Sequence, residues 1–254
     1  WNRGSLAEIV ASPGGAEPAQ RTRALAIALG RFVLPTADGV GGLALRIWLP
    51  ALNEAGLMIK EGVRIDRIDQ AMRRFGMTYG PCDWMDRLGL DTVASSIAAL
   101  QPLFAGRIAF ESGFAAMVER GWLGNRSGMG FYGRGFFGGR KPRRDLAALW
   151  KQSRGAAPRP TPALSEADEH AWIQRRLVTL MILEAARCLE EGVIADPDDL
   201  DCALCLTGWA THRGGPIGYA RQLGGETLTA QCAKLASQYG TRFTPVEALR
   251  RIGT

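Results

Sequence analysis

Few side chains in this sequence have the type and spacing that catalytic or metal sites require. Cys202 and Cys205 form a Cys-x-x-Cys motif, which is the spacing of many zinc and redox sites. No second cysteine pair or suitably placed histidine accompanies the motif, so we expect two buried thiols on one helical face and no metal site. His212 could act as a general base, and Glu8 could be a functional carboxylate or an ordinary solvent-facing residue of a strand edge.

A glycine-rich stretch covers residues 121–132 and ends in two aromatic residues, Phe131 and Tyr132. Its Gly128-x-Gly130 spacing is part of a dinucleotide-binding pattern, but neither a strand nor a helix frames it as such a loop requires. We therefore interpret the stretch as a tight turn laid across a domain, with both aromatic rings packed into that domain, rather than as a phosphate-binding loop.

The elements that must position these residues occur twice in the chain. Residues 49–62 are echoed by residues 179–192, and in each copy a Glu-Ala pair precedes a Glu-Gly pair by the same interval. Glu54 and Glu184 therefore occupy equivalent positions, which predicts a shared structural role such as capping or pairing with a neighbouring helix.

Glycines continue the correspondence beyond these two segments. Only glycine enters the left-handed conformation without a Cβ clash, so matched glycines at helix ends indicate that both copies stop at the same places. The matched positions are Gly62 and Gly192, Gly76 and Gly208, Gly80-Pro81 and Gly215-Pro216, and Gly89 and Gly224. The pattern predicts an internal duplication of one helical unit.

The composition is that of an ordinary globular protein, with 46% apolar and 22% charged residues among 254. The net charge of +6 suggests nucleic acid, but the basic residues are scattered, and the densest run, residues 140–144, falls in an expected linker. An anionic ligand or cofactor is the better explanation of this mild basicity, and we expect no nucleic-acid partner.

Cysteine usage and hydropathy indicate the compartment. Five cysteines without regular spacing indicate a reducing, cytoplasmic environment. No apolar run reaches the length of a membrane span and no signal peptide is visible. The chain begins at Trp1 without a methionine, from which we expect a fragment of a longer protein.

The fold class expected is mainly α, preceded by a short α/β segment. Strands over Leu6–Val10 and Arg31–Pro35 flank a helix over Ala19–Leu29, which are too few strands for a self-standing sheet. Pro50 should kink a long helix over Leu43–Lys60. Further helices are expected over Asp66–Phe75, Pro81–Leu88, Asp91–Phe104, Glu111–Arg120, Asp145–Gln152, Ser165–Glu190 and Leu228–Tyr239, with Asp66 and Asp91 as caps.

This order predicts four segments along the chain. They are the end of a dinucleotide-binding domain (1–36), a first helical domain (37–140), a linker (141–164) and a second helical domain (165–254).

Five motifs, taken in order, resemble the C-terminal region of (S)-3-hydroxyacyl-CoA dehydrogenases. Among these enzymes the resemblance is greatest to the α-subunit of the multifunctional fatty-acid β-oxidation enzyme, which carries this helical domain in tandem. The motifs are Leu6-Ala-Glu-Ile-Val10, Leu52-Asn-Glu-Ala55, Gly80-Pro-Cys-Asp-Trp-Met-Asp-Arg-Leu-Gly-Leu-Asp91, Leu123-Gly-Asn-Arg-Ser-Gly-Met-Gly-Phe-Tyr132 and Arg213-Gly-Gly-Pro216.

The resemblance implies a Rossmann domain that binds NAD, followed by helical domains that close over acyl-CoA. It implies that a histidine takes the proton of the 3-hydroxyl group and that Glu8 orients and charges this histidine. The family histidine and G-x-G-x-x-G loop would lie before Trp1. We therefore expect NAD in the parent protein and no cofactor on this chain alone.

The resemblance also assigns roles to other residues. Met77, Gly80 and Pro81 would face the acyl-CoA cleft, although core packing explains them equally well. His212 falls in the second copy, which implies a structural role. Leu45 stands where the family usually has an asparagine that positions the substrate and the catalytic pair, so that contribution is lost here.

Two functional hypotheses follow from the resemblance. The chain is either the part of a β-oxidation dehydrogenase that forms the acyl-CoA cleft wall and a dimer or pseudo-dimer interface, inactive alone, or a non-catalytic assembly module of a degenerate dehydrogenase. The expected partners are acyl-CoA, the missing Rossmann domain, and a second copy or a β-oxidation complex. A third hypothesis, a nucleic-acid binder, would require the basic residues to converge on one face.

Overall fold

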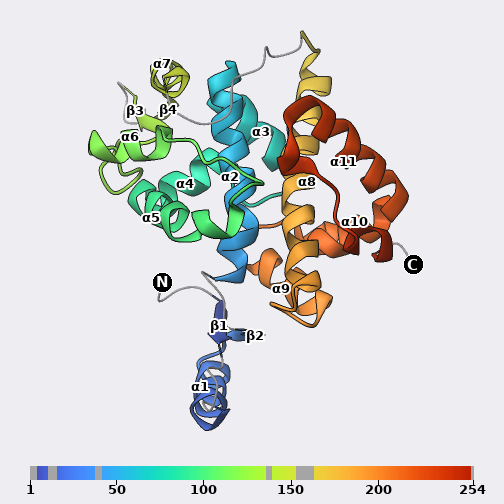
Figure 1. Cartoon of the computed structure of the whole chain (residues 1–254). Coiled ribbons are helices and arrows are strands. Elements are labelled where there is room, and N and C mark those ends of the chain that lie inside the picture. The colour runs from blue at the N-terminus through green and yellow to red at the C-terminus, as the bar shows by residue number, and fades with distance from the viewer. Residues whose placement is uncertain (1–4, 11–15, 38–41, 136–138, 153–162, 253–254) are drawn as a thin grey trace. The chain divides into compact units, whose positions relative to one another are not determined.

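A computed structural model describes residues 5–10, 16–37, 42–135, 139–152 and 163–252 (Figure 1). These residues are mainly helical and begin with a strand–helix–strand segment, which confirms the predicted fold class. They form two compact units, Trp1–Trp48 with Thr179–Thr254, and Leu49–Val178.

The division between the units passes through two long helices, α2 (Leu43–Glu61) and α8 (Glu166–Glu190). Each unit therefore contains one part of each helix, whereas the predicted domain boundaries followed the order of the chain. Pro50 lies inside α2 without ending it.

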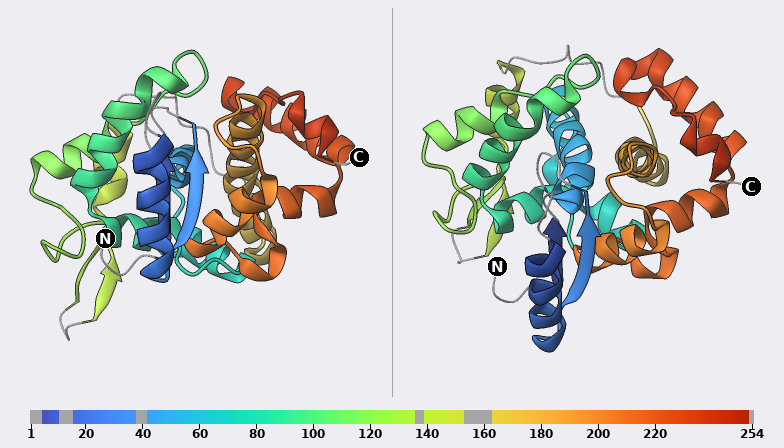
Figure 2. Two further views of the ribbon diagram at one scale, coloured as in Figure 1. Left: turned by 90° about the horizontal axis from the view of Figure 1, so that it is seen from below. Right: turned by 60° about the horizontal axis from the view of Figure 1, so that its bottom comes forward.

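The strand–helix–strand segment belongs to the first unit. Strands β1 (Leu6–Val10) and β2 (Phe32–Thr36) pair in parallel, from Leu6 opposite Phe32 to Val10 opposite Thr36. Helix α1 (Ala16–Ala28) connects the two strands and lies beside them (Figure 2). Several of its apolar side chains face solvent, since Leu25 and Ile27 are 61% and 56% exposed.

The remainder of the first unit is helical and follows α8. Its core includes the fully buried side chains of Leu204, Trp209 and Phe243. Helix α10 packs against α9 and α11. The elements are α9 (Pro197–Leu206), η2 (Thr211–Arg213), α10 (Gly215–Leu223), α11 (Gly225–Tyr239), η3 (Thr241–Phe243) and α12 (Ala248–Arg251).

The second unit places shorter helices and a small hairpin around its part of α2. Trp150 is its largest fully buried side chain, and a Cβ atom on Gly56 would lie 2.3 Å from the Trp150 ring. The elements are α3 (Ile65–Phe75), α4 (Pro81–Leu88), α5 (Leu90–Leu100), η1 (Gln101–Phe104), α6 (Gly113–Glu119), β3 (Tyr132–Arg134), β4 (Arg140–Pro142) and α7 (Leu146–Lys151).

Two predicted helix caps are wrong. Asp66 and Asp91 lie inside the first turns of α3 and α5, and the cap positions are occupied by Arg64 and Gly89. Both caps lie two residues earlier than predicted because Ile65 and Leu90, the first helical residues, are buried in the core. The helix from Asp91 also stops before Phe104, as its last residues form the separate turn η1.

Each unit contains one buried arginine that holds two glutamates. In the first unit Arg46 of α2 binds Glu184 (2.8 Å) and Glu191 (2.7 Å). The predicted pairing role of Glu184 with a neighbouring helix is thereby confirmed.

In the second unit Arg176 of α8 binds Glu54 (2.7 Å) and Glu61 (2.6 Å), so Glu54 has the same role. Burial by itself would lower the pKa of Arg176, but the two carboxylates outweigh it and the pKa lies above its ordinary value.

Candidate functional site

Glu8 of β1 is held against the first turn of α2. Its carboxylate accepts hydrogen bonds from the backbone amides of Leu43 (2.6 Å) and Ala44 (3.1 Å). A negative charge at this position satisfies two unpaired amides and interacts favourably with the helix dipole. The solvent-facing interpretation of Glu8 is therefore wrong, because the side chain is half-buried and fixed.

Gly42 permits this close approach. A Cβ atom there would lie 3.1 Å from one carboxylate oxygen of Glu8, which is tighter than an ordinary contact. Leu45, where the resemblance implies an asparagine, is the residue after the two amides and is half-buried. The fold thus brings Glu8 and position 45 to the same end of α2, and the leucine adds no hydrogen bond there.

The Glu8 carboxylate keeps further hydrogen-bonding capacity. Two carboxylate oxygens offer about four lone-pair sites, and the amides of Leu43 and Ala44 occupy two of them. A carboxylate fixed in this way can accept a hydrogen bond from an imidazole N–H group, orient the ring and stabilise its protonated form.

A second cluster of polar groups is built around Asp69 of α3. Its buried carboxylate accepts hydrogen bonds from the amides of Cys82 (2.8 Å) and Asp83 (3.0 Å) and from the hydroxyl of Tyr132 (2.7 Å). These bonds cap α4, whose first residue is Pro81. Burial outweighs the bonds and raises the pKa of Asp69 to about 6.

Asp86 of α4 anchors the glycine-rich stretch in the same unit. It accepts hydrogen bonds from the amides of Phe131 (2.8 Å) and Tyr132 (2.9 Å), and Arg140 of β4 binds it at 3.0 Å. A Cβ atom on Gly130 would collide with the Asp86 carboxylate. Burial raises the pKa of Asp86.

These contacts settle the role of residues 121–132. Phe131 is fully buried, Tyr132 is half-buried, and Gly124 bridges to Met129 across the turn. The carboxylate of Asp86 accepts hydrogen bonds from the amides of Phe131 and Tyr132, so these amides are not available to a phosphate. The interpretation as a tight turn packed by its aromatic residues is confirmed.

The three residues predicted to face acyl-CoA lie where the turn after α3 leads into the first residue of α4. Met77, Gly80 and Pro81 are all buried. Gly80 contacts Asp69 so closely that a Cβ atom would lie 2.3 Å from it. This close packing explains the residue types at Gly80 and Pro81 without a ligand, and contact with a substrate stays a prediction.

The other candidates from the sequence are Cys202, Cys205 and His212. They also lie in the first unit, but far from Glu8 in the sequence. Cys202 is exposed and Cys205 half-buried, so the expectation of two buried thiols is wrong; the buried face of α9 carries Leu200, Ala203 and Leu204 instead. Burial raises the pKa of the Cys205 thiol. His212 is exposed on η2.

The described residues contain neither a metal-binding cluster nor a membrane-spanning helix. Within these residues, no group of three or more histidine, cysteine, aspartate or glutamate side chains is arranged to hold a metal ion. No helix in the described ranges is long and apolar enough to cross a bilayer.

Comparison with known proteins identifies the segment that carries the Asp69 cluster. Residues 41–134 match the family described as the 3-hydroxyacyl-CoA dehydrogenase, C-terminal domain. This segment is a 3-hydroxyacyl-CoA dehydrogenase C-terminal domain. It contains Leu45, Asp69, Asp86 and residues 121–132.

Solved structures of 3-hydroxyacyl-CoA dehydrogenases share the fold. A 3-hydroxybutyryl-CoA dehydrogenase from Escherichia coli K12 matches 99% of this chain and 68% of its own length, with 19% identity and a TM-score of 0.71. The dehydrogenase part of multifunctional enzyme 1 from C. elegans matches 98% of this chain and 56% of its own length, with 18% identity and a TM-score of 0.64. The chain thus spans about two thirds of the first structure and just over half of the second.

Sequence reasoning missed the roles of Asp69, Asp86 and Tyr132. One signal was present, because Asp69 and Asp201 fall at matching places in the two similar stretches of sequence, each before a Gly-Pro pair that opens a helix. The local capping rule does not reach this role, because it concerns the residue directly before a helix, whereas Asp69 lies within α3.

Proposed function

We propose that this chain is the C-terminal region of an NAD-dependent 3-hydroxyacyl-CoA dehydrogenase of fatty-acid β-oxidation and forms one wall of its acyl-CoA cleft. The observation that carries the proposal is the Glu8 carboxylate, fixed on the amides of Leu43 and Ala44 where the family segment begins. The two amide bonds cap α2, and the same carboxylate keeps lone pairs with which it can orient a catalytic base.

Glu8 acts in this proposal as a positioning residue. A nitrogen of a histidine in the nucleotide domain takes the proton of the substrate 3-hydroxyl group. Glu8 accepts a hydrogen bond from the N–H group on the other side of the imidazole ring. Bound NAD would supply the hydride acceptor for oxidation of the 3-hydroxyl group to a ketone. The amides of Leu43 and Ala44 keep the carboxylate in place while the charge on the imidazole changes.

The strand–helix–strand segment supports a neighbouring nucleotide domain. Two strands alone are marginally stable, and α1 exposes Leu25 and Ile27. Because the chain matches only 68% and 56% of two solved dehydrogenases, we propose that β1, α1 and β2 complete a larger parallel sheet that binds NAD. The chain without that sheet would be inactive.

The two buried arginine clusters support a pseudo-dimer of two helical domains. Arg46 and Arg176 lie 130 positions apart, as do the two glutamate pairs that they bind. Reciprocal contacts of this kind are typical of an isologous interface. We propose that residues 165–254 arose by duplication of the first helical domain. In this proposal they take the place of the second subunit of a dimer.

Steady-state kinetics test the proposal. The full-length gene product should form NADH from NAD and (S)-3-hydroxybutyryl-CoA, and Glu8→Gln should lower kcat by about 100-fold or more, as in other enzymes whose base loses its orienting carboxylate. Glu17→Gln, in the exposed first turn of α1, is the matched control and should leave kcat unchanged.

The rival function is a non-catalytic assembly module, which Leu45 favours because it removes the family amide. That function predicts that the full-length product binds acetoacetyl-CoA or a partner subunit but forms no NADH. Equal activity of Glu8→Gln and the unaltered protein would overturn the role proposed for Glu8.

A further inference from the structure

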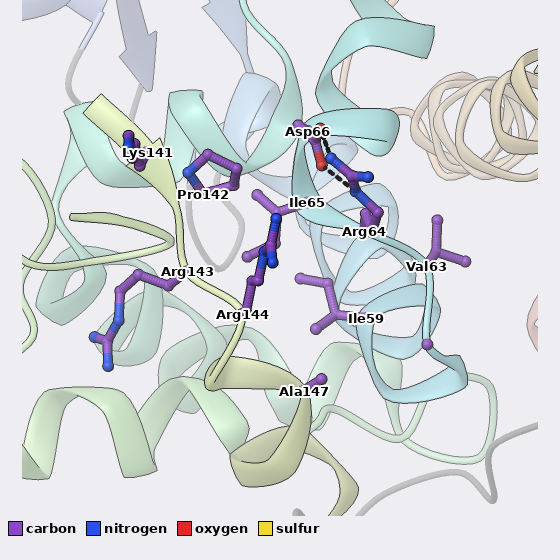
Figure 3. Close-up of a pocket in the computed structure, with 11 residues that line it drawn as sticks. Ile59, Val63, Arg64, Ile65, Asp66, Lys141, Pro142, Arg143, Arg144 and Ala147 are labelled. Atoms are coloured by element: carbon purple, nitrogen blue, oxygen red, sulfur yellow. Dashed lines mark hydrogen bonds and ion pairs between the residues drawn. The ribbon is translucent and has the colours of Figure 1, made fainter. Parts of the chain in front are cut away.

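The second unit contains a cavity of about 850 Å³ that the proposed dehydrogenase reaction does not use (Figure 3). It is lined by the C-terminal end of α2, the first turn of α3, strand β4 and the segment that joins β4 to α7, and it is open to solvent. Ile59, Val63 and Ile65 form an apolar wall on one side. The volume is within the range of about 300–1,000 Å³ that is common for small-molecule sites.

Four cationic side chains line this cavity, and two of them are already neutralised. Arg64 forms two hydrogen bonds with Asp66, at 3.0 and 2.6 Å. Arg143 binds Asp145 and stacks on the Trp122 ring, with its guanidinium carbon 3.7 Å from the ring centroid. Both guanidinium groups are therefore committed within the protein.

The other two cations are Lys141 and Arg144, and neither side chain has an ion-pair partner within the described ranges. Figure 3 shows Arg144 extending towards Ile65 at the start of α3, with Lys141 on the adjoining strand β4. The cavity thus presents two surplus positive charges beside an apolar wall.

The start of α3 adds to this potential. Arg64 occupies its cap position with an extended backbone, and no side chain caps the helix. The amino end of a helix carries a partial positive charge, which Asp66 in the first turn offsets in part. An anion bound by Lys141 and Arg144 would lie near this end.

We propose that the cavity binds a small organic phosphate monoester. A phosphate monoester carries about −1.5 to −2 charges near pH 7, which matches the two free cations, whereas a single carboxylate would leave one unmatched. Lys141 and Arg144 bind the phosphate oxygens, and the organic group packs on Ile59, Val63 and Ile65. The proposal does not depend on dehydrogenase activity.

Isothermal titration calorimetry with three probes tests this proposal on the full chain. Phenyl phosphate should bind about tenfold more tightly than inorganic phosphate, because burial of its ring adds roughly 1.5 kcal/mol. Phenol should show no binding, since it lacks the charge. If inorganic phosphate and phenyl phosphate bind equally, the apolar wall has no role and the monoester assignment is wrong.

Substitutions locate the binding site. The double change Lys141→Gln and Arg144→Gln should weaken phenyl phosphate binding by at least about tenfold, since each lost charge-assisted contact contributes substantially. Lys151→Gln, on the exposed end of α7 outside the cavity, should leave binding unchanged. Both cationic residues are exposed, so thermal unfolding should confirm that the double variant is folded.

A second variant works in the opposite direction. Asp66→Asn removes the only carboxylate that lines the described cavity and frees Arg64, so phenyl phosphate should bind several-fold more tightly. Absent binding of phenyl phosphate, or binding that neither variant changes, would overturn the proposal.

Discussion

The surroundings of Asp69 and Asp201 show one scaffold used in two ways. Each buried carboxylate accepts hydrogen bonds from two backbone amides at the start of the following α-helix. Each also lies against a glycine, Gly80 or Gly215, where a Cβ atom would come within 2.3 Å. Asp69 additionally accepts the hydroxyl of Tyr132, whereas the hydrogen bonds of Asp201 within the described residues are the two amides.

The comparison distinguishes contacts that support the helical scaffold at both places from contacts that occur at only one of them. Capping by a buried aspartate is common to both places, so it serves the helical scaffold. The turn of residues 121–132, held by Asp86 and Tyr132, belongs to the first place and lies within the matched family segment.

The largest predicted contrast concerns the two buried arginines. Arg176→Met removes the cation that binds Glu54 and Glu61, whose side chains are 0% and 3% exposed. The free energy of unfolding should fall by about 3–5 kcal/mol. Arg46→Met should cost about half as much, because Glu191 is 45% exposed and water can solvate its charge. Urea denaturation measures both.

An exposed arginine provides the control for these variants. Arg250→Met, which removes a pair on the surface of α12, should change the free energy of unfolding by less than about 0.5 kcal/mol. Equal losses for Arg46→Met and Arg176→Met would contradict the view that burial of the carboxylates sets the cost.

The aspartate caps should differ by the contribution of one tyrosine. At about pH 7, Asp201→Asn should cost about 1–2 kcal/mol and Asp69→Asn about 1 kcal/mol more, because the single side-chain oxygen of asparagine cannot serve both amides and the Tyr132 hydroxyl. Tyr132→Phe should cost about 1 kcal/mol alone and much less on top of Asp69→Asn. Additive losses in this double-mutant cycle would show that the hydroxyl does not act through Asp69.

The pH dependence follows from the pKa of Asp69, which burial raises from 3.8 to about 6. The folded protein therefore holds this proton more tightly than the unfolded chain does. The stability from Asp69 is fully present below about pH 4 and declines as the pH rises through about 6. The stability difference between the unaltered protein and Asp69→Asn should shrink over this interval, and a growing difference would contradict the account.

Burial also raises the pKa of Asp201 to about 6, so the same experiment on Asp201→Asn should give a similar curve. The comparison isolates Tyr132, which adds a bond to Asp69 alone within the described contacts. A pH dependence confined to one of the two aspartates would show that burial is not the shared cause.

The smallest predicted effect is at the start of α2. Gly42→Ala places a methyl group 3.1 Å from the Glu8 carboxylate, and a shift of a few tenths of an ångström relieves the contact. The free energy of unfolding should fall by about 0.5–1 kcal/mol, less than the loss of a whole cap. A loss as large as that of Glu8→Ala would show that the carboxylate cannot move.

The sequence predicted those elements whose ends are determined by proline or glycine. Helix α4 begins at Pro81 and ends before Gly89, as predicted, because proline favours the first helical position and Gly89 takes a positive φ of 99°. The caps proposed for Asp66 and Asp91 were wrong, because burial of the residue before each one extended the helix.

Contacts between distant residues could not be predicted from local pattern. Arg176 reads as a surface residue of a helix, yet its partner Glu54 lies 122 positions away. The hairpin of β3 and β4 has only three residues per strand, too few for a periodic pattern. Its basic strand, Arg140–Pro142, therefore read as part of a linker. The position of Glu8 was found through the resemblance, but its capping of α2 was not.

The central claim is that the Glu8 end of α2 belongs to a dehydrogenase weakened by Leu45. The most direct test is kcat/KM for NAD-dependent oxidation of (S)-3-hydroxybutyryl-CoA by the full-length product and its Leu45→Asn variant. We expect measurable activity that rises about tenfold or more in the variant, as a new hydrogen bond to a charged group contributes roughly 1.5–3 kcal/mol. Absence of NADH formation by both proteins, with acyl-CoA and NAD bound, would contradict the claim.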